Sequence, residues 1–547
     1  MPDLNDTSAL ETRLRRFLYI GKESRPEYQP GNWFVHNYYD VKNIPSINEL
    51  ASNPDKVGPL IFLIHEAYTR GLVQNTETLI FALAMSARQE ISLELKEKAY
   101  SAMGYICKTP DNFILFNKFT SQLSKKINNK SGWGHGLRRA IKTWYDKKTA
   151  RELAEIICKG LSRYGWKHKD IIRLTHYKPE DENKMFVVDY ILRGMNGIKS
   201  KYQQLNEEQT SLMQYFQSIE DFKHCEDPVV AGRLIETLNL TLDHVPGHLL
   251  TASDIWESLV NAMSIKDLLK YLQRIHNLKF LEPDRTVMIS KVLDVLSEQN
   301  FLKEKPIHPA IFLVCLKDYE NCGKPLSYEK RKVRENAKTP FQPPPAPNKK
   351  VMDALTKLLN LSFAHLQESE TNVHYMITIN MSKTVIESGC WHCGNVTVAE
   401  AGCLIALALL RAEKNVTVAT FVNDEIKCVE LDPNLNFLQA MNHLKKFESN
   451  TDVVDLSKPM TWAADKKQSI DVFINVVNQT YQKSDTSEAG IKSYRTKMGQ
   501  PNTKLVNCAM CASSTQSKNT YDNHILTICG FDEKVPKIIE AFARSFF

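Results

Sequence analysis

The segment "KGLSRYGWKHKDIIRLTHYKP" (159–179) decides how the first two thirds of the chain are interpreted, because it combines apolar residues at helical spacing with eight basic side chains. The spacing predicts short amphipathic helices packed on a core. Their charged face is either an ordinary solvated surface or a surface that receives an anion. The basic residues are Lys159, Arg163, Lys167, His168, Lys169, Arg173, His176 and Lys178.

The same helical pattern extends outward from this segment, from about residue 45 to about residue 320. Apolar residues recur at positions i, i+3, i+4 and i+7, and no alternating strand pattern interrupts them. Amphipathic helices of this kind cannot bury their apolar faces alone, so stacked pairs in an α-solenoid are predicted. Examples are "VGPLIFLIHEAYTRG" (57–71), "TETLIFALAMSARQ" (76–89), "GHGLRRAIKTWYDK" (134–147) and "IKDLLKYLQRIHNL" (265–278).

Positive charge is concentrated in one part of the chain. Residues 118–178 contain sixteen Lys and Arg against four Asp and Glu, a net charge of +12; the whole chain has +7, which leaves −5 for the other 486 residues. A basic surface on a slightly acidic body is typical of a nucleic-acid site, because each neutralised phosphate releases counterions. A solubilising patch is the alternative, but so much charge over consecutive helices favours nucleic acid.

The pattern changes after a linker. Residues 328–350 are rich in charge and then in proline, which predicts a partly extended segment, and one further helix follows at about 351–366. From residue 372 apolar strands alternate with helices, which predicts a parallel, doubly wound α/β sheet. The predicted strands are "HYMITIN" (374–380), "NVTVATFV" (415–422), "IKCVEL" (426–431), "DVFINVVN" (471–478), "TKLVNCAM" (503–510) and "HILTICGF" (524–531).

Composition and motifs exclude several classes of protein. The hydrophobic content of 43% and charged content of 24% are those of a globular protein, and the longest apolar run (401–412) is too short to span a membrane. The N-terminus lacks an apolar signal region and twelve cysteines fit a reducing compartment, so we expect the cytoplasm, with the nucleus as a second location. No P-loop, dinucleotide loop, nucleophile elbow or HExxH helix is present, so we expect no enzymatic activity.

A loop at the end of the first predicted strand after residue 372 carries Asn380, Ser382 and Thr384. Two hydroxyls and a carboxylate such as Asp455 are oxygen ligands that Mg²⁺ accepts, and ligands of such sheets bind at this edge. However, Asn380 is neutral, and so is Asn478 at the end of the matching strand, whereas a hard cation prefers carboxylates. The sequence therefore favours an intact loop without metal over a tight Mg²⁺ site.

Two Cys-x-x-Cys pairs, Cys390/Cys393 and Cys508/Cys511, follow or end strands at the same predicted sheet edge. Such pairs are a zinc signature. The two pairs are more than a hundred residues apart in the chain, and Cys508 lies in an apolar strand, where a buried thiol is ordinary. We therefore expect buried thiols rather than zinc, and the sequence leaves open whether the pairs meet.

The basic region supplies the strongest candidate site. Lys159 and Arg163 are four residues apart, so a continuous helix would project both side chains from one face. Arg138 and Lys142 repeat this spacing one helix earlier. The further candidates are Arg139 beside that pair, Lys167, Lys169, Arg173 and His176, which closes the next helix and can donate to a phosphate or stack on a base. Aromatic residues interleave with these charges as stacking platforms or as core, and for Trp144 the core is favoured.

At these residues the chain resembles a known family. The segment "GWGHGLRRAIKTWY" (132–145) and the segment 159–179 resemble the Ro 60 kDa ribonucleoprotein family of TROVE-domain proteins, and so do "RLRRFLYIG" (13–21), "TLIFALAMSA" (78–87) and "CGFD" (529–532). The resemblance extends from about Arg13 to the C-terminus. It implies a ring of HEAT-like helical repeats over residues 1–366 and a von Willebrand factor A domain over residues 367–547.

The resemblance also implies partners and a site. Proteins of this family bind small noncoding Y RNAs on the outer surface of the ring and take single-stranded 3′ ends of misfolded RNAs through the central hole. The family's Lys, Arg and His contacts to Y RNA match Lys159, Arg163 and His176, in agreement with the face derived from spacing. The family's metal motif, DxSxS, departs here to Asn380-x-Ser382-x-Thr384, and a later aspartate is Asn478.

The sequence thus predicts a monomeric RNA-binding protein of a cytoplasmic ribonucleoprotein that serves the stability or quality control of noncoding RNA. We expect it to act by binding and not by chemistry, without a membrane partner, and with Mg²⁺ as the one cofactor that the loop at 380–384 leaves open. The alternative is a protein-interaction scaffold of a telomerase- or vault-like particle, in which the solenoid and the A domain bind protein partners. An RNA site predicts binding that falls steeply with salt, whereas a protein-binding groove does not.

Overall fold

The computed structural model describes residues 7–31, 39–128, 133–159, 164–324, 332–333, 344–369, 371–423, 425–479, 486–514 and 522–547. They belong to two compact units. The first unit comprises residues 1–23, 34–262 and 547, and the second comprises residues 24–33 and 263–546.

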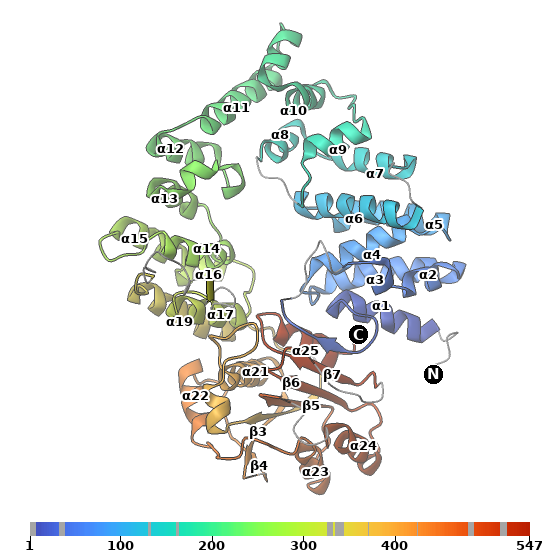
Figure 1. Ribbon diagram of the computed structural model, residues 1–547, viewed down its shortest axis with the longest axis vertical. Helices are drawn as coiled ribbons and strands as arrows, with labels where there is room; N and C mark the ends of the chain where they lie inside the picture. Colours follow the sequence, from blue (N-terminus) through green and yellow to red (C-terminus); the bar gives the residue numbers. More distant parts are fainter. Residues whose placement is uncertain are drawn as a thin grey trace. The chain divides into compact units, whose positions relative to one another are not determined.

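The first unit is helical (Figure 1). Each helix packs on helices a few positions away in the chain; for example α4 contacts α5 and α6, and α7 contacts α5 and α9. This local contact pattern is that of the predicted α-solenoid. The helices are α1 Thr7–Ile20, α2 Ser46–Ala51, α3 Val57–Arg70, α4 Thr76–Arg88, α5 Leu93–Ile106, α6 Pro110–Asn128, α7 His135–Asp146, α8 Ala150–Cys158, α9 His168–Thr175, α10 Glu182–Lys201, α11 Glu207–Lys223, α12 Pro228–Leu238 and α13 Ser253–Asn261.

The second unit combines helices with a sheet. Helix α21 covers one face of the sheet through contacts with β2, β3 and β5, and α17 and α19 pack on α21. The helices are α14 Ile265–Asn277, α15 Thr286–Val295, α16 Glu298–Lys303, α17 Pro309–Glu320, α19 Lys349–Ala364, α20 Lys383–Glu387, α21 Val398–Ala412, α22 Phe437–Lys445, α23 Lys458–Asp465, α24 Thr486–Met498 and α25 Val535–Ala543. The strands are β1 Glu27–Tyr28, β2 His374–Asn380, β3 Asn415–Val422, β4 Glu425–Cys428, β5 Val472–Val477, β6 Lys504–Ala509 and β7 Ile525–Cys529.

The sheet is doubly covered, as the buried strands predict. Its seven strands have the order β1-β7-β6-β5-β2-β3-β4. Side chains of α23 and α24, such as Met460 and Tyr494, form a buried core cluster with Met376 and Phe473 on one face. On the other face Gly402 of α21 lies so close to β2 that a Cβ there would be 2.9 Å from a methyl carbon of Ile379.

The strands predicted after residue 372 and the helix predicted at about 351–366 are confirmed, but the sheet is not wholly parallel. Strand β4 pairs with β3 in the antiparallel direction, whereas the other pairs are parallel. Only residues 423 and 424 separate the two strands, which is too few for a parallel crossover. Most of the linker predicted at 328–350 lies outside the described residues.

Two predictions on the large scale stay predictions. The compact units divide after residue 262, and α17 and α19, which contact α21, belong to the second unit. The boundary predicted between residues 366 and 367 separates two functional domains and not two compact units, so it stays a prediction. Closure of the HEAT-like helices into a ring is the other prediction.

Strand β1 comes from the N-terminal part of the chain and was not predicted. It pairs with β7, and Tyr28, which is 1% exposed, donates a hydrogen bond to Oδ2 of Asp532 at 2.8 Å. Burial, and next the charge of Glu533, raise the pKa of Asp532 to about 6, while the hydrogen bond from Tyr28 favours its ionised form. A two-residue strand carries no periodicity by which the sequence could reveal it.

Replacing Tyr28 with Phe removes this donor. We expect the free energy of unfolding to fall by about 1–3 kcal/mol at pH 8, and by less at pH 5, because a protonated Asp532 gains less from the hydrogen bond. Urea unfolding at both pH values measures the loss, with Tyr68→Phe as the control, since the Tyr68 hydroxyl has no hydrogen-bond partner among the described residues. An equal loss at both pH values would contradict this account.

Candidate nucleic-acid interface

An aromatic cluster joins helices α6, α7 and α9. Phe113 of α6 stacks on Trp144 of α7 with ring centroids 3.9 Å apart, and both rings lie nearly parallel to the imidazole of His168 on α9. Trp144 is 3% exposed, and its indole N–H donates to the carbonyl of Cys107 at 2.8 Å. The core role predicted for Trp144 is confirmed.

His168 is part of this core and not of the charged surface. It is 8% exposed, and its Nδ1 lies 2.9 Å from the hydroxyl of Tyr145. Burial, and next the charge of Lys159, lower the pKa of His168 to about 4. The imidazole is therefore neutral at pH 7, as expected for a group buried among aromatic rings.

Three of the candidate lysines meet at one pocket. Lys159, Lys167 and Lys169 line a cavity of about 190 Å³ between α6, α8 and α9, together with Lys223 of α11. Two carboxylates, those of Asp111 and Asp243, also line it, so the lysines outnumber the acids two to one. The pocket thus presents a net positive charge at the surface of the first unit.

The helix predicted to join Lys159 to Arg163 is wrong for Lys159. Helix α8 ends at Cys158, and Lys159 is extended, with φ −61° and ψ 115°. The next residue is Gly160, a residue type that commonly follows helix ends. Lys159 still contributes to the candidate surface through the pocket and not through an i, i+4 pair, and Arg163 lies outside the described residues.

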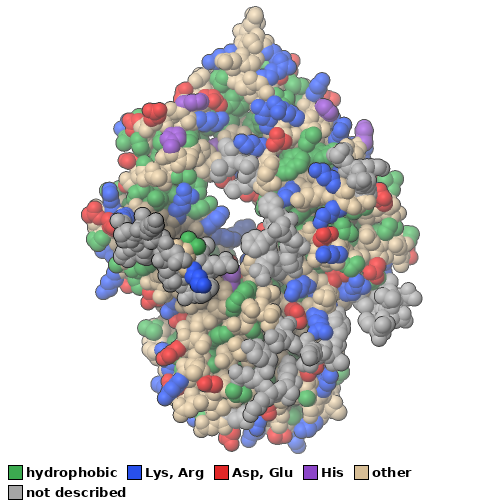
Figure 2. Space-filling model, in the orientation of Figure 1, with side chains coloured by type: hydrophobic (Ala, Val, Ile, Leu, Met, Phe, Trp, Pro, Cys, Tyr) green, Lys and Arg blue, Asp and Glu red, His purple; other side chains and the backbone are tan. Residues whose placement is uncertain are grey.

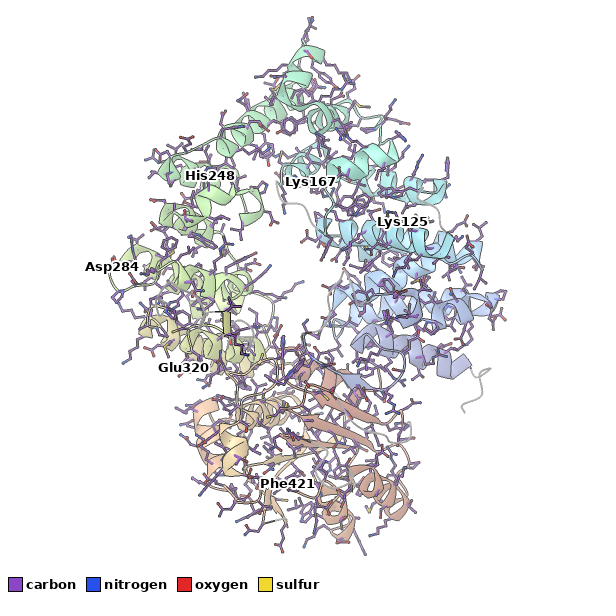
Figure 3. All side chains as sticks on the ribbon, viewed as in Figure 1. Lys125, Lys167, His248, Asp284, Glu320 and Phe421 are labelled. Carbon is purple, nitrogen blue, oxygen red and sulfur yellow. The ribbon has the colours of Figure 1, made fainter. Side chains whose placement is uncertain are left out.

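Helix α9 carries three candidate residues on one face. Lys169, Arg173 and His176 follow each other at i, i+4 and i+7, and Arg173 and His176 are exposed. His176 closes the helix, as predicted, in the left-handed conformation with φ 51°. Lys167 lies at the N-terminal end of the same helix, where Figure 3 labels it.

Helix α7 has basic residues on two flanks. Arg138 and Lys142 lie on the flank that carries Tyr145, which contacts α9, and the Nε of Arg138 is buried without a hydrogen-bond partner among the described residues. Arg139 is exposed on the other flank, with Thr143, whose hydroxyl donates to the Arg139 carbonyl at 3.0 Å. The cluster at 138–142 is therefore divided by the geometry of the helix.

The candidate cations that the structure describes form no ion pairs with carboxylates. Within the part of the chain that the structure describes, no ion pair joins an Asp or Glu to any of Arg138, Arg139, Lys142, Lys159, Lys167, Lys169 and Arg173. Elsewhere in the first unit such pairs are frequent, for instance Arg151 with Glu155 at 2.8 Å. Blue Lys and Arg side chains recur over the first unit on the face shown in Figure 2.

Two interleaved tryptophans stack on each other. The ring centroids of Trp133 and Trp166 are 5.5 Å apart with an interplanar angle of 27°. They connect the start of α7 with the turn before α9, in which Tyr164 and Gly165 have φ values of 52° and 79°. Trp166 is half-buried, and its use as a platform for a base stays a prediction.

The loop after β2 does not fit a magnesium ion. The amide of Asn380 accepts from the backbone N–H of Ser382 at 3.0 Å and donates to the carbonyl of Asp452 at 3.1 Å, so it directs an N–H into the loop. The hydroxyl of Thr384 donates to the carboxylate of Asp452. The carboxylate of Asp455 accepts two hydrogen bonds from Ser457, at 2.9 and 2.7 Å.

These contacts leave one carboxylate, that of Asp452, beside the hydroxyls of Ser382 and Thr384. The amide nitrogen of Asn380 cannot bind a cation. The oxygen of Asn478 is likewise used, by the backbone N–H of Gln479 at 2.9 Å. Over the described residues there is no group of three or more His, Cys, Asp and Glu able to hold a metal ion. The donor set therefore favours the metal-free loop.

The two Cys-x-x-Cys pairs approach each other without forming a metal site. Burial raises the pKa of the Cys390 thiol well above its usual range. The nearby thiols of Cys511, Cys393 and Cys508 raise it further. The Cys511 thiol donates a hydrogen bond to the carbonyl of Gly389 at 3.5 Å. Raised thiol pKa values oppose the thiolates that zinc requires.

Sequence reasoning missed some residues of the basic surface. Lys223 of α11 reaches the pocket of Lys159 from 64 residues further along the chain, and no local spacing indicates this. Arg88, at the end of the apolar helix α4, is buried beside α7. A cation that ends an apolar run is the single sequence signal that points to Arg88.

Comparisons with known proteins agree with this architecture. A family model described as "TROVE domain" matches residues 62–240, and one described as "Ro60 vWA domain" matches residues 374–543. The fold class is thus a helical TROVE region followed by a von Willebrand factor A domain.

Relatives match over nearly the whole chain. A Caenorhabditis elegans protein named "RNA-binding protein RO60" is 23% identical over 97% of this chain and 87% of its own length. A Deinococcus radiodurans protein of the same name is 21% identical over 98% of this chain and 92% of its own length. The crystal structure of the Deinococcus radiodurans RO (RSR) protein has a TM-score of 0.80 at 19% identity, and covers 98% of this chain and 100% of that one, which shows a common fold. The chain belongs to the Ro60/TROVE family.

Among the residues described, no helix is both long and apolar enough to cross a bilayer.

The neutral His168 predicts a pH dependence of stability. The pKa of His168 is lower in the folded protein than the ordinary value of 6.5, so the unfolded chain binds a proton between about pH 6.5 and 4 that the folded protein excludes. Stability from this residue is complete above pH 6.5 and is lost as the pH falls, at about 1.4 kcal/mol per pH unit.

The measurement is urea unfolding of the wild type and of His168→Phe from pH 7.5 to 5. The substitution has its own cost, because it removes the partner of the Tyr145 hydroxyl, but the difference between the two proteins should shrink steadily as the pH falls below 6.5. A difference that stays constant over this range would show that His168 is not buried in its neutral form.

The ligands available in the loop after β2 predict that magnesium does not stabilise the protein. We expect the melting temperature of the wild type to change by less than about 1 °C when millimolar Mg²⁺ is added, because a ligand stabilises a protein only when its concentration exceeds the Kd. Asn380→Asp restores a carboxylate and should gain a magnesium-dependent rise. A rise of several degrees in the wild type would refute the metal-free assignment.

Proposed function

We propose that this protein binds RNA through a surface of its first unit, which we call the α7–α9 surface. The observation that carries the proposal is that the described candidate cations, which lie within the part of the chain that has a net charge of +12, form no ion pairs with carboxylates. Its described residues are Arg138, Arg139, Lys142, Lys159, Lys167, Lys169, Arg173 and His176, and Arg163 is proposed to belong to it.

The names of the relatives support this proposal, since both full-length relatives are called RNA-binding proteins. The electrostatics of the surface support it independently. Unpaired Lys and Arg gain most when they neutralise phosphates and release counterions, and such contacts confer affinity more than sequence preference. His176, exposed at the end of α9, can donate to a phosphate or stack on a base.

The finer proposal names the RNA. Structured small noncoding RNAs of the Y type would bind the α7–α9 surface by the shape of a duplex and the positions of its phosphates. Single-stranded 3′ ends of misfolded RNAs would be held separately, in the central hole of the ring that the family resemblance implies, by backbone charge and stacking. The protein would then serve the stability and quality control of noncoding RNA.

The proposed mechanism is binding without a chemical step. The candidate residues are lysines, arginines and one exposed histidine, and they hold no nucleophile paired with a base. We therefore propose that the protein is not an enzyme, and that it acts as a monomeric scaffold for RNA. Protein partners would be engaged by the A domain.

A charge reversal on α9 tests the proposal. Lys169→Glu/Arg173→Glu places two negative charges on the exposed face of α9, and we expect RNA affinity to fall at least about tenfold at physiological salt. The slope of log K against log salt should also become shallower by about 0.7–0.9 for each phosphate contact removed. Recovery and sequencing of RNA from native extract, followed by binding titrations with the recovered RNAs, measure both quantities.

The matched control is Lys266→Glu/Lys270→Glu, which reverses two exposed charges four residues apart on α14. It should leave RNA recovery unchanged. If wild type and α9 variant recover no RNA above background, the proposal fails and the protein-scaffold alternative, a telomerase- or vault-like particle component, takes its place.

A further inference from the structure

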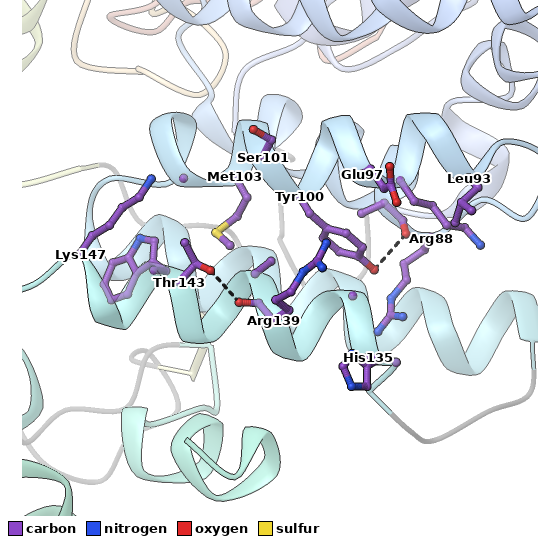
Figure 4. A pocket seen from close by; sticks show the side chains of 17 residues that line it. Arg88, Leu93, Glu97, Tyr100, Ser101, Met103, His135, Arg139, Thr143 and Lys147 are labelled. Carbon is purple, nitrogen blue, oxygen red and sulfur yellow. Dashed lines mark hydrogen bonds between the residues drawn. The ribbon is translucent and has the colours of Figure 1, made fainter. Parts of the chain in front are cut away.

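A second basic pocket lies between α5 and α7, apart from the cavity of Lys159. Its volume is about 590 Å³, which is in the range of small-molecule sites. Arg88, Lys96, Arg139 and Lys147 line it, and Glu97 is the one carboxylate among the lining residues that the structure describes. Figure 4 shows these side chains from close by.

Arg88 is the most unusual of these residues, because its guanidinium is buried and incompletely bonded. The residue is 9% exposed, its Nε donates to the carbonyl of Thr120 at 3.2 Å, and its Nη2 is buried without a partner among the described residues. No carboxylate of the described residues forms an ion pair with it, and burial lowers its pKa. A buried cation with an unused donor is costly unless an anion completes its hydrogen bonds.

The first turn of α7 opens on the same pocket. Gly134 is the N-cap, no side chain caps this end of the helix, and Gly134, His135 and Gly136 line the cavity. A Cβ on Gly134 would lie 4.0 Å from Nη1 of Arg88, so the guanidinium and the helix N-terminus are neighbours. Backbone N–H groups at a helix N-terminus attract anions, and here a buried arginine accompanies them.

The rest of the pocket is larger than a phosphate group. It extends along α7 past Arg139 to Lys147, and Tyr100 of α5, whose hydroxyl donates to the carbonyl of Ala87 at 3.3 Å, forms part of the opposite wall. In Figure 4 Arg88 is directed toward His135, and Arg139 toward Tyr100. The ligand that fits is thus an anion attached to an organic group.

We propose that this pocket binds the terminal phosphate of a nucleotide, with Arg88 and the first turn of α7 on the phosphate and Arg139 as a second cation. A phosphate monoester carries a charge of about −1.5 to −2 at pH 7 and has a single substituent, so it reaches the recessed Arg88 where a phosphodiester, substituted on both sides, does not. The source is either an RNA end, which rests on the proposed function, or a free mononucleotide, which does not.

Isothermal titration calorimetry with the full-length protein tests the inference. One short single-stranded RNA is titrated in three forms, with a 5′-phosphate, with a 3′-phosphate and with hydroxyls at both ends. AMP and adenosine are titrated in parallel. We expect at least one phosphorylated ligand to bind about tenfold or more tightly than its unphosphorylated counterpart.

Three variants locate the effect. Arg88→Gln should abolish the preference for the phosphorylated ligand, and Arg139→Gln, which changes an exposed residue and leaves the core intact, should reduce it. Arg233→Gln is the matched control: Arg233 is exposed on α12 and its carbonyl accepts from Thr237 at 2.8 Å, as that of Arg139 accepts from Thr143 at 3.0 Å. It should keep the preference.

The outcomes separate this inference from the proposed function. A preference for phosphorylated RNA alone supports the pocket with RNA ends as the source, and tighter binding of AMP than of adenosine supports it with free mononucleotides as the source, even if RNA does not bind. Equal affinity for all three RNAs together with no preference for AMP over adenosine overturns the inference, and leaves the α7–α9 surface as proposed. A preference that survives both Arg88→Gln and Arg139→Gln overturns it as well.

Discussion

The candidate surface depends on one buried contact, the pairing of neutral His168 with the hydroxyl of Tyr145 inside the aromatic cluster of α6, α7 and α9. This contact fixes α9 against α7, and the basic residues of both helices take their positions from it. It also explains why one basic residue of the segment 159–179 is uncharged. The pKa of about 4 keeps His168 neutral in its surroundings, while the lysines on either side of it, Lys167 and Lys169, remain at the surface.

The consequence is a surface whose described lysines and arginines form no ion pairs with carboxylates. Cations that lack carboxylate partners repel each other, and a polyanion removes that repulsion by binding. The same reasoning applies to exposed and to buried cations of the first unit. Exposed residues such as Arg173 would contact a phosphate backbone, whereas the buried guanidinium of Arg88 requires a group small enough to enter a pocket. The depth of the cations therefore distinguishes the two proposed anion sites, whereas the amino-acid composition of the first unit does not.

The sequence predicted the periodic elements and missed the contacts between distant ones. The predicted strands and α19 lie where the apolar runs and the helical spacing indicate, because local periodicity determines such elements. By contrast β1, two residues long, and Lys223 of α11, which lines the same pocket as Lys159, have no local signal. The predicted helix through Lys159 and Arg163 was wrong for Lys159, because α8 ends at Cys158 and the spacing of charges does not indicate this end. The neutral amides at Asn380 and Asn478 are held by hydrogen bonds to the backbone, and the absence of a tight magnesium site stays a prediction.

The most direct test of the RNA-binding account is to map the contacts by photocrosslinking. RNA recovered from native extract is transcribed with 4-thiouridine, bound to the protein and irradiated, and the crosslinked peptides are identified by mass spectrometry. The account predicts crosslinks within residues 133–178, at Trp166, His176 or their neighbours. Crosslinks confined to residues 228–261 or to the A domain at 374–543 would contradict it, because RNA would then bind a surface without the gathered cations.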